Sequence, residues 1–326
     1  MRVRPSGFTY VLLQDLIPEL GTGNWGYIIK DALGFAPWEC PYVSKASYQR
    51  ELLTYTVARP AQLPDFRAPP LNEVVLGVQF SPPKNYQQIY AGSVWELFKS
   101  EYPNVQELAS IPPSFETFGI SHQRPAVPQI RFDVGGSHDR FWFLRPAADE
   151  LIQFQQDRLL HNWRRSDDET NKYPRFESML GRFHDELIKL QNFVATLSPQ
   201  TLQINQCEVS YVNHIHTGPG EDFSPSKWLK FMNFSDKGPD DFSMTFREVI
   251  RDASGSPQSR LTCETSSGIL ANGNEVIVIN LTVRGAPRGS DIDSALEFLA
   301  AGRDVIVNKF AELTTDESHK VWERTQ

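Results

Sequence analysis

The sequence predicts an α+β protein built from two similar β-α-β-β-β-α halves, whose strands form antiparallel sheet covered by two long amphipathic helices. Three observations support this. The same order of strand-like and helix-like segments occurs twice within residues 63–326. Ser-x-Trp recurs at the same place in each half, at 93–95 and 226–228. Each half also ends in a long segment whose apolar residues share one helical stripe. Together these observations indicate an internal duplication.

The first half begins where the sequence becomes rich in β-branched residues, at 72–80, a stretch bounded by proline on both sides as a strand should be. Pro103 ends the following helix, because proline cannot continue a helix interior. The predicted elements are a strand at 72–80, a helix at 91–103, strands at 128–134, 140–146 and 151–163, and a closing helix at 178–197.

The second half repeats this order. Its first helix begins with Ser224 as the expected N-cap and Pro225 in the first turn. The predicted elements are a strand at 202–216, a helix at 224–232, strands at 242–250, 260–267 and 275–285, and a closing helix at 294–313. We expect the two halves to join edge to edge in one curved sheet of about eight strands, which removes two exposed edges.

Apolar residues in 1–62 do not recur with a sustained period of 2 or of 3.6 residues, although 47–57 could make a short helix or strand. We therefore expect three parts. Residues 1–62 are an N-terminal extension, either poorly ordered or translated from a miscalled start. Residues 63–199 are the first half, and residues 200–326 are the second half.

Composition limits the classes of partner. Hydrophobic residues make up 40% and charged residues 22% of the 326 residues, which is ordinary for a globular protein. The net charge of -8 disfavours a broad, sequence-independent grip on nucleic acid, although a local basic patch would still permit one. No apolar run approaches the ~20 residues that span a bilayer, so we expect no membrane association.

The N-terminus and the cysteines favour a cytoplasmic protein. The apolar stretch near the start is interrupted by Gln14 and Asp15, which argues against a signal peptide. The three cysteines, Cys40, Cys207 and Cys263, form no CxxC pair and leave one unpaired in any disulfide scheme. A reducing cytoplasm is the simplest interpretation.

Several short sequence motifs indicate a family resemblance that the composition does not reveal. They are PPLNEVVLGVQF (69–80), NWR (162–164) followed by YPRFE (173–177), SYVNHI (210–215) and FAELTTDESHKVW (310–322). From about Leu63 to the C-terminus, the chain resembles an uncharacterised, sporadically distributed prokaryotic protein family whose members are shorter. The resemblance excludes residues 1–62, which favours the miscalled start, and it implies no known activity.

The segment 162–177 supplies the first candidate binding residues, which are Asn162, Arg164, Arg175 and Glu177. They bracket an acidic loop, and arginine is suited to bidentate recognition of carboxylate or phosphate. In the alternative, which we favour, Arg164 or Arg175 pairs with Glu177 or Asp157 and locks the corner between strand and helix. Glu73 is a further possible partner of one of these arginines.

The strand at 202–216 supplies the second group, Tyr211, Asn213 and His214. Alternation puts Glu208, Ser210, His214 and His216 on one face, and Cys207, Val209, Tyr211, Asn213 and Ile215 on the other. His214 and His216 could share a metal, with Glu208 adding a carboxylate. No second cluster with ligand spacing occurs elsewhere, so we predict hydrogen-bonding roles at the sheet surface and no metal or cofactor.

The commonest catalytic and nucleotide motifs are absent from the sequence: there is no G-x-S-x-G elbow, no G-x-x-x-x-G-K-[ST] loop and no G-x-G-x-x-G after a strand. The sequence therefore favours a non-enzymatic binding or interaction module of the prokaryotic cytoplasm. Its ligand would be an unknown protein or small molecule, held by the sheet surface or by the cleft between halves. The sporadic distribution of the resembling family fits an accessory or defence-associated role.

Two alternatives come from other classes. The first is a hydrolase acting on a phosphate-bearing or nucleic-acid substrate, with Arg164 and Arg175 as anion clamps and His214, His216 and Glu208 as acid-base or metal residues. This alternative requires Arg175 and His214 to meet in one pocket. The second is a duplicated sheet that grips nucleic acid like a saddle, which the net charge disfavours.

Overall fold

One antiparallel sheet of nine strands runs through the part of the chain that the computed structural model describes, which comprises residues 59–119, 139–166, 171–216, 224–233, 239, 241–270 and 273–326. All of these residues belong to the unit Tyr55–Gln326. The strands are β1 Leu71–Phe80, β2 Asn104–Leu108, β3 Arg140–Leu144, β4 Glu150–Gln155, β5 Arg158–Arg164, β6 Ile204–His216, β7 Ser243–Arg251, β8 Pro257–Ile269 and β9 Glu275–Gly285. Their order in the sheet is β2-β3-β4-β5-β1-β6-β9-β8-β7.

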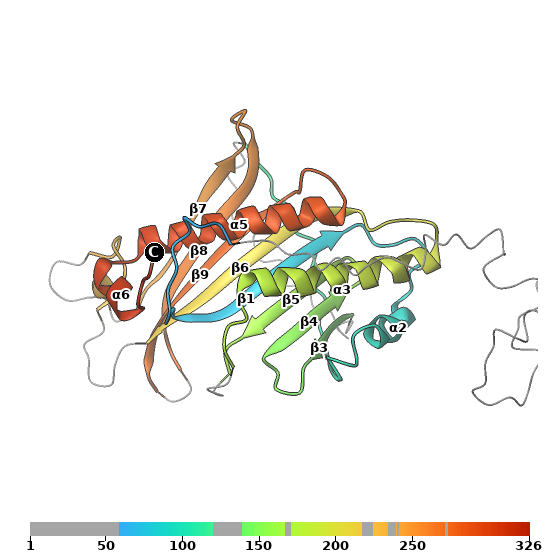
Figure 1. The fold of residues 1–326 in the computed structure, drawn as a ribbon, viewed down its shortest axis with the longest axis horizontal. Coiled ribbons are helices and arrows are strands. Elements are labelled where there is room, and N and C mark those ends of the chain that lie inside the picture. Colours follow the sequence, from blue (N-terminus) through green and yellow to red (C-terminus); the bar gives the residue numbers. More distant parts are fainter. Residues whose placement is uncertain are drawn as a thin grey trace, which may run out of the picture. The chain divides into compact units, whose positions relative to one another are not determined.

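The helices are mostly short, apart from two of 22 residues each (Figure 1). They are η4 Gln88–Tyr90, α2 Ala91–Glu96, α3 Phe176–Leu197, α4 Pro225–Trp228, α5 Ile292–Leu313 and α6 Asp316–Val321. The predicted α+β class is therefore confirmed. None of the described helices is long and apolar enough to cross a membrane.

The two long helices begin differently. Asp291 caps α5, because its carboxylate accepts a hydrogen bond from the Ser294 amide at 2.8 Å. α3 begins after Arg175, which has φ +73° and makes no side-chain cap bond. Gly302 allows α5 to lie close to the sheet, since a Cβ there would stand 2.6 Å from Val209 and 3.3 Å from Val283.

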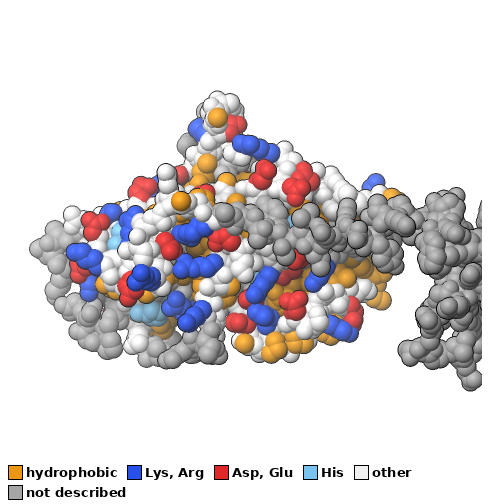
Figure 2. Space-filling model, in the orientation of Figure 1, with side chains coloured by type: hydrophobic (Ala, Val, Ile, Leu, Met, Phe, Trp, Pro, Cys, Tyr) orange, Lys and Arg blue, Asp and Glu red, His pale blue; other side chains and the backbone are white. Residues whose placement is uncertain are grey.

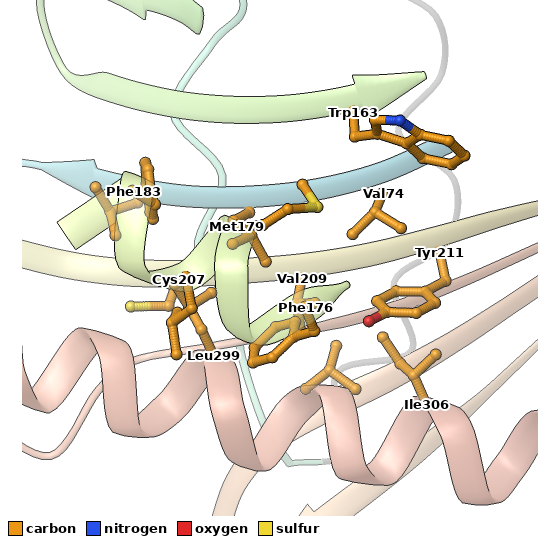
Figure 3. Close-up of a cluster of buried hydrophobic side chains, with 14 of the residues drawn as sticks. Val74, Trp163, Phe176, Met179, Phe183, Cys207, Val209, Tyr211, Leu299 and Ile306 are labelled. Atoms are coloured by element: carbon orange, nitrogen blue, oxygen red, sulfur yellow. The ribbon is translucent and has the colours of Figure 1, made fainter. Parts of the chain in front are cut away.

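The hydrophobic core lies between the sheet and the long helices (Figure 3). α5 packs against β6 and β9, α3 packs against β5, and the two helices contact each other. The central strand β1 pairs with β5 on one side and β6 on the other. Its residues from Val74 to Phe80 are all buried, which explains why this stretch reads as a nearly continuous apolar run.

The predicted strand at 151–163 is wrong in one respect, because it forms two strands. β4 ends at Gln155 and β5 begins at Arg158, with a tight turn between them. Asp157 stabilises this turn by accepting hydrogen bonds from Gln155 Nε2 at 2.9 Å and Arg158 Nε at 3.2 Å. The turn contains no glycine or proline, so the usual signal of a hairpin is missing from the sequence.

Other differences are smaller. The helix predicted at 91–103 is regular only as α2 and continues as turns to Glu101. The helix predicted at 224–232 is the single turn α4; Ser224 is its N-cap residue but makes no side-chain cap bond. β2 and α6 were not predicted. The strand predicted at 128–134 lies outside the described residues, as do the predictions for residues 1–58. The remaining strands and both long helices agree with prediction to within a few residues.

Candidate functional site

The two faces of the sheet have different chemistry. Val209 and Val283 contact α5, so their neighbours on the same strands point to the opposite side. There Glu208 accepts a hydrogen bond from Arg284 Nε at 2.6 Å, and the hydroxyls of Ser210 and Thr282 lie 2.7 Å apart. We call this side the polar face. Its residues used below are Glu73, Gln79, Arg140, Gln155, Arg158, Asn162, Arg164, Gln206, Glu208, His214, Arg247, Arg260 and Arg284.

Residues 109–119, here called the strap, follow β2 and cross the polar face. Three glutamines, on β4, β1 and β6, bind its main chain. Gln155 does so twice: its Oε1 accepts from the Ile111 amide and its Nε2 donates to the Ile111 carbonyl, both at 2.9 Å. Gln79 Oε1 accepts from the Ser114 amide at 2.9 Å, and Gln206 Oε1 accepts from the Glu116 amide at 3.4 Å.

Three arginines bind further carbonyl groups of the strap. Arg140 Nε donates to the Ala109 carbonyl at 3.0 Å. Arg158 donates to the Pro112 carbonyl at 3.1 Å, and Arg260 donates to the Thr117 carbonyl at 2.8 Å. These contacts follow the strap in order across the sheet, from β3 to β8. The polar face therefore holds an extended chain mainly by its main-chain groups.

Several arginines of the polar face also have acidic partners. Arg260 Nε donates to Glu116 Oε2 of the strap at 2.7 Å, and the Arg260 guanidinium lies 5.4 Å from the Phe118 ring. Arg284 pairs with Glu208, and Arg158 Nε lies 3.2 Å from Asp157. Carboxylates thus offset much of the positive charge on this face.

Two cavities flank the strap. One, of about 460 Å³, is lined by Gln79, Arg158 and Gln206 together with strap residues. The other, of about 530 Å³, lies between the strap and the strands β6 to β9. Glu208 and Arg247 are among its lining side chains, so this second cavity carries both signs of charge.

The structure places Asn162 and Arg164 on the polar face. Both donate to Glu73 Oε1, Asn162 at 2.6 Å and Arg164 at 2.9 Å. The predicted pairing of Glu73 with an arginine is therefore confirmed. The expected partners of the two arginines are wrong, since Arg164 binds Glu73 and Arg175 binds Asp65 at 2.9 Å instead of Glu177 or Asp157. The strand register explains the partner of Arg164, because Glu73 lies directly opposite it.

Glu177 lies in the first turn of α3 and has a different partner. Its Oε1 is 3.1 Å from Arg303 Nη1, a buried guanidinium on α5 that also lies 2.9 Å from Asp304. The Arg303 guanidinium stacks over the Phe176 ring at 4.6 Å. Glu177 thus ties α3 to α5, and its contacts are structural.

Tyr211 and Asn213 point to the helix side of β6. Their side chains line a small cavity of about 70 Å³ together with Arg175. The hydroxyls of Tyr211 and Tyr173 are 3.1 Å apart, and burial raises the pKa of Tyr211 to about 12. Asn213 is buried, and its amide lies 3.5 Å from the Ile279 carbonyl.

His214 projects from the polar face, opposite to its neighbour Asn213. Burial and the charge of His216 lower the pKa of His214, and the Glu73 carboxylate opposes that shift. Arg175 and His214 therefore lie on opposite sides of the sheet and do not form the shared pocket that the hydrolase alternative requires. Within the described ranges, no group of three or more His, Cys, Asp and Glu side chains could hold a metal ion.

Sequence reasoning missed the residues that bind the strap. Gln79 breaks an apolar run, whereas Gln155 and Gln206 alternate with the buried neighbours Phe154 and Cys207. That alternation could have placed them on one face, but nothing local shows that they meet residues 109–119. No protein-family profile, curated protein or solved structure matches the chain.

Proposed function

We propose that the chain is a non-enzymatic binding module of the prokaryotic cytoplasm, and that it binds its partner on the polar face of the sheet. The observation that carries the proposal is the strap. An extended segment already lies across this face, held by glutamine and arginine side chains from β3 to β8. A surface that binds one extended segment in this way has the groups needed to bind another.

The charge distribution favours a protein or small-molecule partner over nucleic acid. Arg158, Arg164, Arg260 and Arg284 each lie beside a carboxylate on or next to the polar face. On the side that carries α3 and α5, Figure 2 shows lysine and arginine interspersed with aspartate and glutamate. A nucleic-acid saddle needs a basic surface that is not neutralised in this way.

We also infer that the two halves, residues 63–199 and 200–326, arose by duplication, with α3 and α5 as the helices that cover the sheet. The sheet order supports this inference. On one side of the central pair the order is β1-β5-β4-β3, and on the other it is β6-β9-β8-β7. Each half thus places its first strand at the centre, its last strand next to it and its middle strands outward, with β2 as an addition in the first half.

The test is native mass spectrometry of the chain, tagged at its C-terminus and purified from its own host. Three forms are compared: wild type, Arg247→Glu and Glu297→Arg. Arg247 is exposed beside the 530 Å³ cavity of the polar face, whereas Glu297 is exposed on α5. We expect the same bound partner on wild type and Glu297→Arg, and loss of that partner with Arg247→Glu. A partner that both variants keep, or both lose, would contradict the polar face as the binding surface.

A further inference from the structure

We propose that the polar face binds an extended, acidic segment of a partner protein in exchange with the strap, so that the strap is a built-in competitor for the site. This inference rests on the proposed function and names the chemistry of the partner. The contacts of the strap define what such a segment must offer.

Most of the contacts involve groups that any extended peptide has. The amides of Ile111, Ser114 and Glu116 donate to glutamines of the sheet, and four carbonyl groups between Ala109 and Thr117 accept from glutamine and arginine side chains. Since these are main-chain groups, they set a conformation and a direction but little sequence preference. The face is therefore suited to extended chains in general.

The strap is bound in a way that permits exchange. It is joined to the strands by side-chain hydrogen bonds, each with a net contribution of only about 0.5–1.5 kcal/mol. It buries little apolar surface, because Ile111 is 37% and Phe115 is 54% exposed. By contrast Gln79, Gln155 and Gln206 beneath it are each less than 9% exposed. Releasing the strap would thus remove the main-chain amides that donate to the side-chain oxygens of these three glutamines, and a replacement chain could supply new donors.

Side-chain contacts of the strap give the sequence preference. The Glu116 carboxylate pairs with Arg260 at 2.7 Å, and the Phe118 ring lies under the same guanidinium. Pro112 and Pro113 carry no amide hydrogen, and no strap contact requires one at either position. We therefore expect a partner segment that contains a carboxylate at the position of Glu116 and tolerates proline before it.

The experiment uses a fluorescent synthetic peptide with the sequence of residues 107–119, ELASIPPSFETFG, added to the full chain. Binding is measured by fluorescence anisotropy on wild type and on Glu116→Lys. The substitution places a lysine against Arg260 and so weakens the strap of the chain itself. We expect Glu116→Lys to bind the peptide at least tenfold more tightly than wild type does. Hydrogen exchange should show faster exchange of the amides of residues 109–119 in the variant.

Matched controls separate specific from nonspecific binding. A peptide with lysine in place of the glutamate that corresponds to Glu116 should bind the Glu116→Lys variant at least tenfold more weakly, because Arg260 then faces a cation. Adding Gln155→Ala to Glu116→Lys should weaken peptide binding several-fold, since the bidentate contact is lost. Adding Glu297→Lys, on the exposed side of α5, should leave binding unchanged.

Three results would contradict exchange between the strap and a partner segment. In the first, the strap opens in Glu116→Lys but the peptide does not bind more tightly. In the second, the strap amides of the variant stay as protected as in wild type, and in the third, Glu116→Lys unfolds the chain. The last two would make the strap a fixed part of the fold. None of these results bears on the Arg247→Glu comparison. If Arg247→Glu loses its partner but the peptide does not bind Glu116→Lys more tightly, the polar face remains the proposed binding surface. Only its proposed preference for an extended acidic segment is then removed.

Discussion

His161 and Glu186 form a buried contact between the sheet and α3: His161 Nδ1 lies 3.0 Å from Glu186 Oε1 and 3.1 Å from Oε2. The Tyr102 hydroxyl donates to the same Glu186 Oε1 at 3.2 Å, and Glu150 lies 3.8 Å from His161 Nε2. Burial lowers the pKa of His161, but the charges of Glu186 and Glu150 and the hydrogen bond to Glu186 outweigh it, so the pKa is raised overall. His161 thus lies between two buried carboxylates, which favour its protonated form.

This contact predicts that stability depends on pH. Because the pKa of His161 is higher in the folded chain than in the unfolded chain, its contribution is fully present below about pH 6.5 and is lost as the pH rises through the folded-state value. We expect the free energy of unfolding of wild type in urea to fall as the pH rises above about 6.5. His161→Gln should remove this part of the pH dependence and lower stability by about 3–5 kcal/mol, since it leaves buried carboxylate without its cation.

The control is His216→Gln, at an exposed position of β6. It should keep the pH dependence of wild type. An equally steep fall in wild type and His161→Gln would show that other groups cause it.

The contact between Glu177 and Arg303 predicts a structural effect for a residue that the sequence suggests as a binding candidate. The Arg303 side chain is 1% exposed, so Glu177→Gln removes one of the two carboxylates beside a buried guanidinium. We expect a loss of about 1–3 kcal/mol in urea unfolding. Glu312→Gln removes an exposed carboxylate from a pair with Lys309, which keeps Glu248 as a second partner, and should cost less than about 0.5 kcal/mol. Equal effects of the two variants would contradict a buried role for the first pair.

The close approach of α5 to the sheet gives a third prediction. Gly302→Ala would bring a Cβ to 2.6 Å from Val209 Cγ1, so we expect it to destabilise the chain by about 1–3 kcal/mol. Gly92 is a matched control, because a Cβ there meets nothing within 4 Å in α2. Gly92→Ala should be neutral or slightly stabilising by up to about 1 kcal/mol. Thermal unfolding of both variants measures the difference, and a harmless Gly302→Ala would mean that α5 can shift outward.

The neutralised arginines of the polar face predict weak binding to nucleic acid. In a titration with a labelled DNA duplex of about 30 base pairs, we expect no affinity tighter than the nonspecific range of about 10⁻⁴–10⁻⁶ M at physiological salt. A tighter complex whose affinity falls steeply with added salt would favour the saddle alternative.

The sequence predicts well those features that repeat along the chain. The stripe Phe183, Leu187 and Leu190 gives α3, and the alternation of β6 puts Val209 inward and Glu208 outward. The sequence does not show which buried polar side chains contact each other. His161 in an apolar strand and Glu186 on an apolar helical stripe each break a pattern, but their contact depends on how the helix packs on the sheet.

The strap is unpredictable from local pattern for a related reason. Residues 109–119 contain serine, proline and glycine without a period, which is typical of a loop. Their position depends on three glutamines and three arginines from six different strands of the sheet, whose alignment is a property of the whole topology. Only the complete strand order brings Gln155, Gln79 and Gln206 into one row.

The strap also has a consequence for synthesis of the chain on the ribosome. Arg260 follows Glu116 by 144 residues, and Arg284 follows Ser114 by 170 residues. At about 5–20 residues per second, the strap emerges roughly 7–30 s before Arg260, its main anchor in the second half, has been translated. During this interval the strap can bind only the residues already translated, such as Gln79, Gln155 and Arg158, and neither the strap nor a partner segment can yet pair with Arg260.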